Sequence, residues 1–305
     1  MAGALALSAC GSASTSSNRT TTATNTPTAA ATTGQATLRA SNGLPLAAPA
    51  TRIVSLSEAA TEDLFAVGAG KQVIAADEYS VYPANAPRTK LSGFEPNIEA
   101  IAAYRPDLVV TSQDVDHIET QLAALHVPLL YEPAPANLDG AYAQIEQLGA
   151  ATGRAGAAAA VVAGMRRQVG AIVASVKHEQ PPLTVYHELD QTHFSASSDT
   201  FIGQLYSLLG LRNIADKAAK ATPYPQLSDE YIIASDPDLI VLADTVCCGQ
   251  SVKTVAARPG WANLSAVKDH AVLAVNDTVA SEWGPRIVLF LGQVAAELRR
   301  IEARR

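Results

Sequence analysis

The sequence predicts an α/β protein with two parallel-sheet lobes, joined by a single long helix and enclosing a ligand cleft between them. From about residue 51 onwards, short apolar strands alternate with helices of ordinary length, which is typical of parallel sheets. The chain also contains an internal repeat. Asn97-Ile98-Glu99, an apolar helical run and Pro106-Asp107-Leu108 return 131 positions later as Ser228-Asp229-Glu230, an apolar run and Pro237-Asp238-Leu239.

Composition supports a globular protein and argues against a nucleic-acid partner. The 305 residues can supply two lobes with separate cores, since 48% are hydrophobic and only 17% are charged. The formal net charge is −7, and no run of lysine and arginine exceeds two residues. A nucleic-acid-binding domain would instead carry a basic stripe.

The first fifty residues predict a lipid anchor and a tether. Residues 1–10 resemble the remnant of a signal peptide ending in a bacterial lipobox, Leu7-Ser8-Ala9-Cys10, which makes Cys10 the expected lipidation site. Residues 11–50 are rich in serine, threonine and alanine without apolar periodicity, so we expect a disordered tether. Together they predict an extracytoplasmic protein anchored to the outer face of the cell membrane.

Residues 51–152 are predicted to form the N-terminal lobe. Ser57 and Asn97 are expected to cap helices that follow a strand and a proline-rich loop, respectively. Acidic residues after Ser57 suit the positive end of the helix dipole. The expected strands are 52–56, 73–75, 108–111 and 127–131, with helices following Ser57, from Asn97 to 104 and over 114–125.

Residues 153–178 are predicted to be the linking helix, because the alanine-rich run has no turn signal stronger than isolated glycines until Gln180-Pro181-Pro182. Residues 179–305 are predicted to form the C-terminal lobe. Its expected strands include 184–188 and 239–242, and its expected helices include 200–210, the one containing Glu230, and 285–300.

Three segments resemble the helical-backbone substrate-binding proteins of ABC importers, which take up cobalamin, ferric siderophores and haem. They are RIVSLSEAATEDLFAVGAGKQVIAADEYSVYP, LSGFEPNIEAIAAYRPDLVV and ARPGWANLSAVKDHAVLAV. The resemblance covers roughly residues 51 to 302 and is nearest to the cobalamin-binding branch. It implies a monomeric protein with no enzymatic activity or resident cofactor, working with a permease and an ATPase.

The resemblance also implies site residues. Aromatic positions of the cobalamin-binding branch match Tyr79, Phe94, Tyr224 and Trp283, all of which lie in loops beside proline or glycine. Aromatics in such loops of α/β proteins more often line a pocket than fill a core. In the family, one glutamate on each lobe docks onto permease arginines, and the matching residues are Glu99 and Glu230.

Several alternatives remain open from the residues alone. Glu99 and Glu230 could simply be helix-start acids. Arg286 could clamp an anionic ligand group or pair with Glu282. Cys247 and Cys248 could form a vicinal disulfide or stay as thiols, and could line the cleft.

His187 is a candidate ligand contact, and with Glu188, Asp190 and His193 it could bind a metal, although no repeated histidine pattern supports that reading. The leading function is capture of a corrinoid such as cobalamin for an ABC importer. Ferric-siderophore or haem binding is the alternative within the family. A chelatase-like enzyme built on His187, Asp190, His193 and the two cysteines, or a direct metal-ion binder, represents another class.

Overall fold

The computed structural model describes residues 39–46 and 49–305. The predicted leader, Cys10 and most of the predicted tether lie outside these residues. The end of the predicted tether is packed rather than free: Ser41 donates its backbone N–H to the carbonyl of Leu129, and Leu46 is buried. The prediction of a tether reaching residue 50 is therefore too long, because apolar side chains just before residue 51 already belong to the N-terminal lobe.

The N-terminal lobe is a four-stranded parallel sheet in the order β2-β1-β3-β4. Its strands are β1 (Ile53–Leu56), β2 (Val73–Ala76), β3 (Leu108–Thr111) and β4 (Leu129–Tyr131). Its helices are α1 (Glu58–Ala66), α2 (Ile98–Ala103), α3 (Ile118–Ala124) and α4 (Leu138–Ala151), with short 3₁₀ turns at Gly70–Gln72 and Val115–His117.

The C-terminal lobe repeats this topology, with the order β6-β5-β7-β8 and all pairs parallel. Its strands are β5 (Thr184–Glu188), β6 (Arg212–Asn213), β7 (Leu239–Leu242) and β8 (Val272–Ala274). Its helices are α6 (Phe201–Leu208), α7 (Asp229–Ser235), α8 (Val252–Ala256), α9 (Ser265–Lys268), α10 (Asp277–Ser281) and α11 (Ile287–Glu302), with 3₁₀ turns at Ile214–Lys217 and Trp261–Asn263.

The repeated Pro-Asp pair has a structural cause. The carboxylate of Asp107, just before β3, accepts hydrogen bonds from the backbone N–H groups of Thr51 and Arg52, just before β1. Asp238, just before β7, accepts from the backbone N–H and hydroxyl of Thr184 at the start of β5. In each lobe, one aspartate thus ties the amino ends of the two central strands together.

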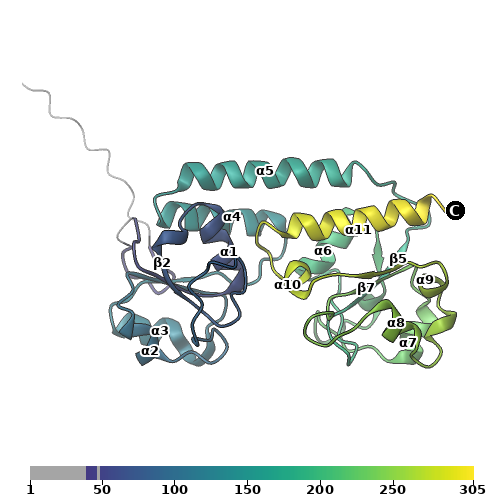
Figure 1. The fold of residues 1–305 in the computed structure, drawn as a ribbon, viewed down its shortest axis with the longest axis horizontal. Helices are drawn as coiled ribbons and strands as arrows, with labels where there is room; N and C mark the ends of the chain where they lie inside the picture. The colour runs from purple at the N-terminus through teal and green to yellow at the C-terminus, as the bar shows by residue number, and fades with distance from the viewer. Residues whose placement is uncertain (1–38, 47–48) are drawn as a thin grey trace, which may run out of the picture. The chain divides into compact units, whose positions relative to one another are not determined.

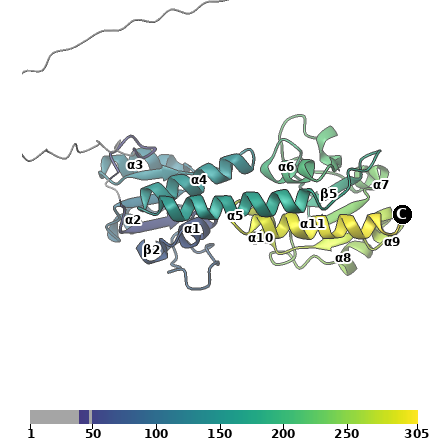
Figure 2. The same ribbon diagram turned by 90° about the horizontal axis from the view of Figure 1, so that it is seen from above.

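Helix α5 (Ala155–Val173) runs along one side of both lobes, packed against α4 and α11 (Figures 1 and 2). Its buried face is the stripe Ala158, Val162 and Met165, at helical spacing. At 1.5 Å per residue its 19 residues span about 28 Å. The sequence predicts a longer helix, but Gly153, with φ +72°, ends α4 and separates it from α5.

A second difference concerns residues 114–125, where the sequence predicts one helix. Asp116 and His117 have positive φ values of 54° and 58°, so a 3₁₀ turn precedes a shorter α3. Aspartate and histidine tolerate this left-handed conformation better than most side chains. Among the described residues, no helix is both long and apolar enough to span a membrane.

Candidate ligand-binding cleft

A cavity of about 320 Å³ lies where the carboxyl ends of the N-terminal strands face residues of the C-terminal lobe. Parallel α/β sheets characteristically bind ligands at these strand ends. The N-terminal lobe contributes residues from the ends of β1, β2 and β3 and from the loop before α2, and the other lobe contributes the segment between α10 and α11. The lining residues are Leu56, Ser57, Glu58, Asp77, Tyr79, Gly93, Phe94, Ser112, Gln113, Glu282 and Trp283.

Two aromatic side chains form one wall of this cavity. The rings of Tyr79 and Phe94 meet edge to face with centroids 5.4 Å apart, and both side chains remain about half exposed. Gly93 allows this arrangement, since a Cβ there would lie 2.3 Å from the carbonyl oxygen of Leu56 at the end of β1. The loop therefore approaches the strand end closely enough to hold Phe94 at the cavity.

Trp283 lines the cavity from the C-terminal lobe. It follows α10, whose first residue, Asp277, accepts hydrogen bonds from the backbone N–H groups of Val246 and Cys247 in the loop after β7. Three of the aromatic residues proposed from the sequence are thus brought to one cavity from two lobes. Tyr224 is not among the residues lining it; it is 39% exposed on a loop of the C-terminal lobe.

Arg286 joins the lobes instead of lining the cavity. Its backbone N–H and Nε both donate to the carboxylate of Glu62 on α1, each at 2.6 Å. Its guanidinium also lies 3.9 Å from the ring centre of Tyr82. The sequence offered a ligand anion or Glu282 as the partner, and the expectation of Glu282 is wrong because α1 presents Glu62 to the start of α11. Gly284 lies against the same carboxylate.

His187 has no access to the cavity in this structure, which contradicts its proposed role as a ligand contact. It is fully buried, its Nδ1 is 2.6 Å from the hydroxyl of Tyr206, and its ring packs against Phe290. Burial lowers the pKa of His187 to about 3, so the imidazole is neutral. All five residues of β5 are buried, so a strand covered on both faces has hidden the side chain.

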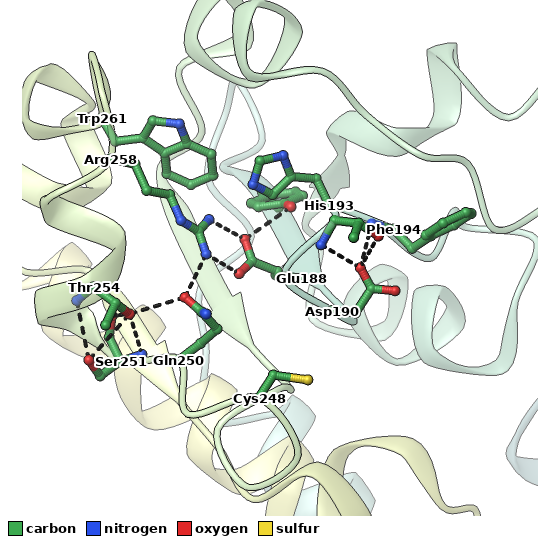
Figure 3. A network of polar contacts seen from close by, with 12 residues as sticks. Glu188, Asp190, His193, Phe194, Cys248, Gln250, Ser251, Thr254, Arg258 and Trp261 are labelled. Carbon is green, nitrogen blue, oxygen red and sulfur yellow. Dashed lines mark hydrogen bonds and ion pairs between the residues drawn. The ribbon is translucent and has the colours of Figure 1, made fainter.

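The other polar residues near β5 are engaged separately (Figure 3). Arg258 donates to both carboxylate oxygens of Glu188 at 2.5 and 2.6 Å, and also to Gln250. Asp190 accepts from the backbone and hydroxyl of Thr192, and the His193 ring lies 5.5 Å from that of Trp261.

Cys247 and Cys248 form a vicinal disulfide and do not line the 320 Å³ cavity. Within residues 39–46 and 49–305, no cluster of three histidine, cysteine, aspartate or glutamate side chains is placed to hold a metal. The residues considered for an enzyme site therefore make separate local contacts instead of forming one cluster. They are His187, Asp190, His193, Cys247 and Cys248.

Two carboxyl groups from opposite lobes meet in the cavity. Glu58, in the first turn of α1, and Glu282, between α10 and α11, both line the cavity, and each shifts the pKa of the other. Burial, together with the neighbouring Glu282, raises the pKa of Glu58 to about 8, and burial, with Glu62 and Asp77 nearby, raises the pKa of Glu282 to about 7. The two carboxyl groups therefore titrate as a coupled pair that is still partly protonated near neutral pH.

Glu99 and Glu230 occupy equivalent positions in the two lobes. Each is the second residue of its helix, after a side-chain cap from Asn97 on α2 or Ser228 on α7, and each is exposed. Within the described part of the chain, neither carboxylate takes part in a salt bridge. Both helices lie on the side of the lobes opposite α5 (Figure 1).

Comparison with known proteins identifies the family. Residues 53–278 match the family described as periplasmic binding protein. The chain belongs to this family. A cobalamin-binding protein of Halobacterium salinarum is 32% identical over 254 residues, covering 80% of this chain and 68% of that protein. A vitamin B12-binding protein of Pectobacterium atrosepticum is 29% identical, covering 82% and 89%.

Solved structures of periplasmic binding proteins share the two-lobe fold. The periplasmic vitamin B12 binding protein BtuF of Vibrio cholerae superposes with a TM-score of 0.70 at 24% identity, covering 83% of this chain and 98% of that one. The haem-binding protein HutB of the same organism gives 0.72 at 22%, covering 81% and 98%. At these identities the structural similarity establishes the fold alone, so the predicted fold class is confirmed.

The polar lining of the cavity in this periplasmic binding protein was not predicted from the sequence. Glu58 directly follows the cap residue Ser57, and Glu282 directly precedes Trp283, so both were adjacent to residues already singled out. Phe194, which was also missed, is 39% exposed after β5 and pairs with Gln226 beside the Tyr224 loop. Phe194 also lies in a loop that follows a strand, the kind of position at which aromatic residues of α/β proteins line pockets.

Proposed function

We propose that this periplasmic binding protein captures a corrinoid, with cobalamin as the leading candidate, and delivers it to an ABC importer. The observation that carries the proposal is the cavity with Tyr79 and Phe94 on one side and Trp283 on the other. Flat aromatic walls suit a macrocycle with large faces. The names of the cobalamin-binding and vitamin B12-binding relatives support the choice of ligand.

A corrinoid is larger than this cavity, so we infer that only part of it is enclosed there. The remainder would extend over exposed apolar side chains of the C-terminal lobe. Phe194 and Tyr224 are the candidates, because both rings are exposed and their loops lie beside each other. Arg286 is excluded from this proposed contact set by its pairing with Glu62, and His187 by its burial. Binding requires no chemical step, and none of the relatives named above is described as an enzyme.

Trp283→Ala and Tyr79→Ala are each expected to weaken cobalamin binding by about tenfold to a hundredfold, because truncating a buried aromatic anchor commonly costs about 1–3 kcal/mol. The measurement is an absorbance titration of the purified protein with cobalamin. Leu125→Ala removes a half-exposed apolar side chain at the end of α3 and serves as the control. Wild-type affinity in both aromatic variants would contradict the proposed site.

The same titration should include haem and a ferric siderophore, the alternative ligands within the family. A haem affinity above that for cobalamin would replace the corrinoid by haem as the proposed ligand. The fold similarity to HutB keeps this outcome worth measuring, since the two-lobe fold serves both ligand classes.

We further propose that Cys10 carries a lipid that holds the protein on the outer face of the cell membrane. The lipobox-like Leu7-Ser8-Ala9-Cys10 and the serine- and threonine-rich segment after it support this. Cys10→Ser in cells is expected to move the protein from the membrane fraction to the soluble extracytoplasmic fraction. Unchanged membrane retention would count against the anchor.

A further inference from the structure

The cavity lining includes acidic side chains from both lobes. Glu58 and Glu282 meet as a carboxyl pair across the gap between lobes, and Asp77, at the end of β2, lines the same cavity. Ser57, Ser112 and Gln113 supply the remaining polar side chains of the lining. Glutamate and aspartate therefore provide the only charged groups among the described lining residues.

No cation compensates this charge at the cavity surface. None of the lining residues is lysine, arginine or histidine. Arg286 is the basic group whose charge lowers the pKa values of both Glu58 and Glu282. Its own two hydrogen bonds go to Glu62. The other charged groups that face the pair are acidic: Glu62 and Asp63 from α1, and Asp77.

Asp77 is already hydrogen-bonded within the protein. Its Oδ1 accepts hydrogen bonds from the backbone N–H and the hydroxyl of Ser80, and the residue is 2% exposed. Glu58 and Glu282 line the same cavity as Tyr79, Phe94 and Trp283, and within the described residues neither takes part in a salt bridge. A ligand group placed beside the pair gains free energy by donating hydrogen bonds and loses free energy by bringing negative charge.

Building on the proposed function, we propose that Glu58 and Glu282 are specificity-determining residues that select ligands presenting neutral hydrogen-bond donors, such as primary amides, and reject ligands presenting carboxylates. A corrinoid carries peripheral primary amides, and haem carries carboxylates. The same aromatic walls would accommodate the face of either macrocycle, so the carboxyl pair supplies the discrimination. Like charges brought together at an interface cost enough to suppress a wrong partner.

The test compares two corrinoids that differ only in peripheral groups, one with all amides intact and one in which amides have been hydrolysed to carboxylates. At pH 9, where the pair has lost its protons, wild-type protein is expected to prefer the amide form by about tenfold or more, a difference of 1.4 kcal/mol per factor of ten. The double variant Glu58→Gln/Glu282→Gln keeps the shape of both side chains, removes their charge and replaces one acceptor oxygen of each by a donor NH2 group, so it is expected to lose most of this preference. Glu146→Gln, an exposed glutamate on α4 outside the cavity, is the control.

Measuring the preference at pH 6 and pH 9 separates charge from shape. The pKa values of about 8 for Glu58 and about 7 for Glu282 lie above the usual value, so the pair holds its protons at pH 6 and loses them towards pH 9. The wild-type preference for amides is therefore expected to grow with pH, while that of the double variant stays constant. A hydrolysed corrinoid remains fully ionised over this range, so its own charge does not change.

The outcomes are distinct. Failure of wild-type protein to bind either corrinoid overturns the proposed function, and the specificity proposal with it. Equal affinity for the two corrinoids, with both bound, overturns the specificity proposal alone. A preference that persists unchanged in the double variant also overturns it, because the discrimination would then come from other residues.

Discussion

Glu62→Ala is expected to lower the free energy of unfolding by about 3–5 kcal/mol, the usual cost of removing one partner from a buried ion pair. The side chain of Glu62 is 4% exposed and that of Arg286 is 19% exposed. Removal of the carboxylate leaves the guanidinium and the backbone N–H of Arg286 without their acceptor. Because the pair connects α1 to α11, the loss should also loosen the two lobes. Urea unfolding measures the effect.

A matched control is the exposed pair of Arg166 and Asp139, 2.9 Å apart with side chains 56% and 76% exposed. Asp139→Ala is expected to cost less than about 1 kcal/mol, since surface ion pairs contribute little. The double variant Glu62→Leu/Arg286→Met should recover much of the lost stability, because it leaves no buried charge unpaired. A cost for Glu62→Ala no larger than that for Asp139→Ala would show that the interlobe pair does not stabilise the protein.

Reversing both docking charges, with Glu99→Arg and Glu230→Arg, is expected to abolish ligand uptake by cells while leaving ligand affinity within about a factor of three. Uptake should fail because an arginine at each site would face the permease arginines that the family resemblance implies. Affinity should survive because both residues are exposed and outside the cavity, where substitutions usually change stability by less than about 0.5 kcal/mol. Uptake of labelled ligand and a binding titration give the two readouts.

Asp139→Arg provides the control for the helix dipole, and because it also breaks the pair with Arg166, its stability cost is expected to be at least as large as that of either docking substitution. Asp139 is the second residue of α4, after the cap residue Asn137, so it occupies the same helix position as Glu99 and Glu230. Any loss of stability from placing a cation at a helix start should therefore appear in all these variants. Normal uptake in the Glu99→Arg/Glu230→Arg protein would contradict docking through these residues and leave them as helix-start acids.

Loss of uptake in the Asp139→Arg control as well would trace the effect to folding. Each single reversal should reduce uptake without abolishing it, because the unchanged lobe would still offer one contact to the permease. The placement of α2 and α7 on one side, away from α5, means that both glutamates can face the same flat partner (Figure 1).

Local sequence signals predicted most of the fold. Ser57 and Asn97, the two predicted caps, each accept a hydrogen bond from a backbone N–H in the first turn of the following helix. Thr200 and Ser228 do the same in the C-terminal lobe. The repeated Pro-Asp unit predicted two matched halves, and the two sheets have the same strand order. These features depend on residues within a few positions of one another, or on a pattern that appears twice.

The candidate site was predictable only in part. Tyr79, Phe94 and Trp283 were implied by the family resemblance, and their positions in loops favoured pocket lining over core packing. The acidic residues of α1 were interpreted as helix-start acids, although Glu62 and Asp63 are buried and Glu58 lines the cavity. Helix periodicity places them near each other but does not reveal what the other lobe brings against them.

The sequence by itself determined two parallel α/β lobes and the helix caps at Ser57 and Asn97, because these follow from short-range periodicity and residue chemistry. The aromatic residues of the cleft were implied by the resemblance to the binding-protein family. Only the tertiary structure decided which side chains become partners. Glu62 and Arg286 are 224 positions apart, and their contact exists because packing of α4, α5 and α11 brings the lobes together. His187 was hidden for the same kind of reason, since helices cover both faces of β5. Burial and long-range pairing are properties of the assembled chain.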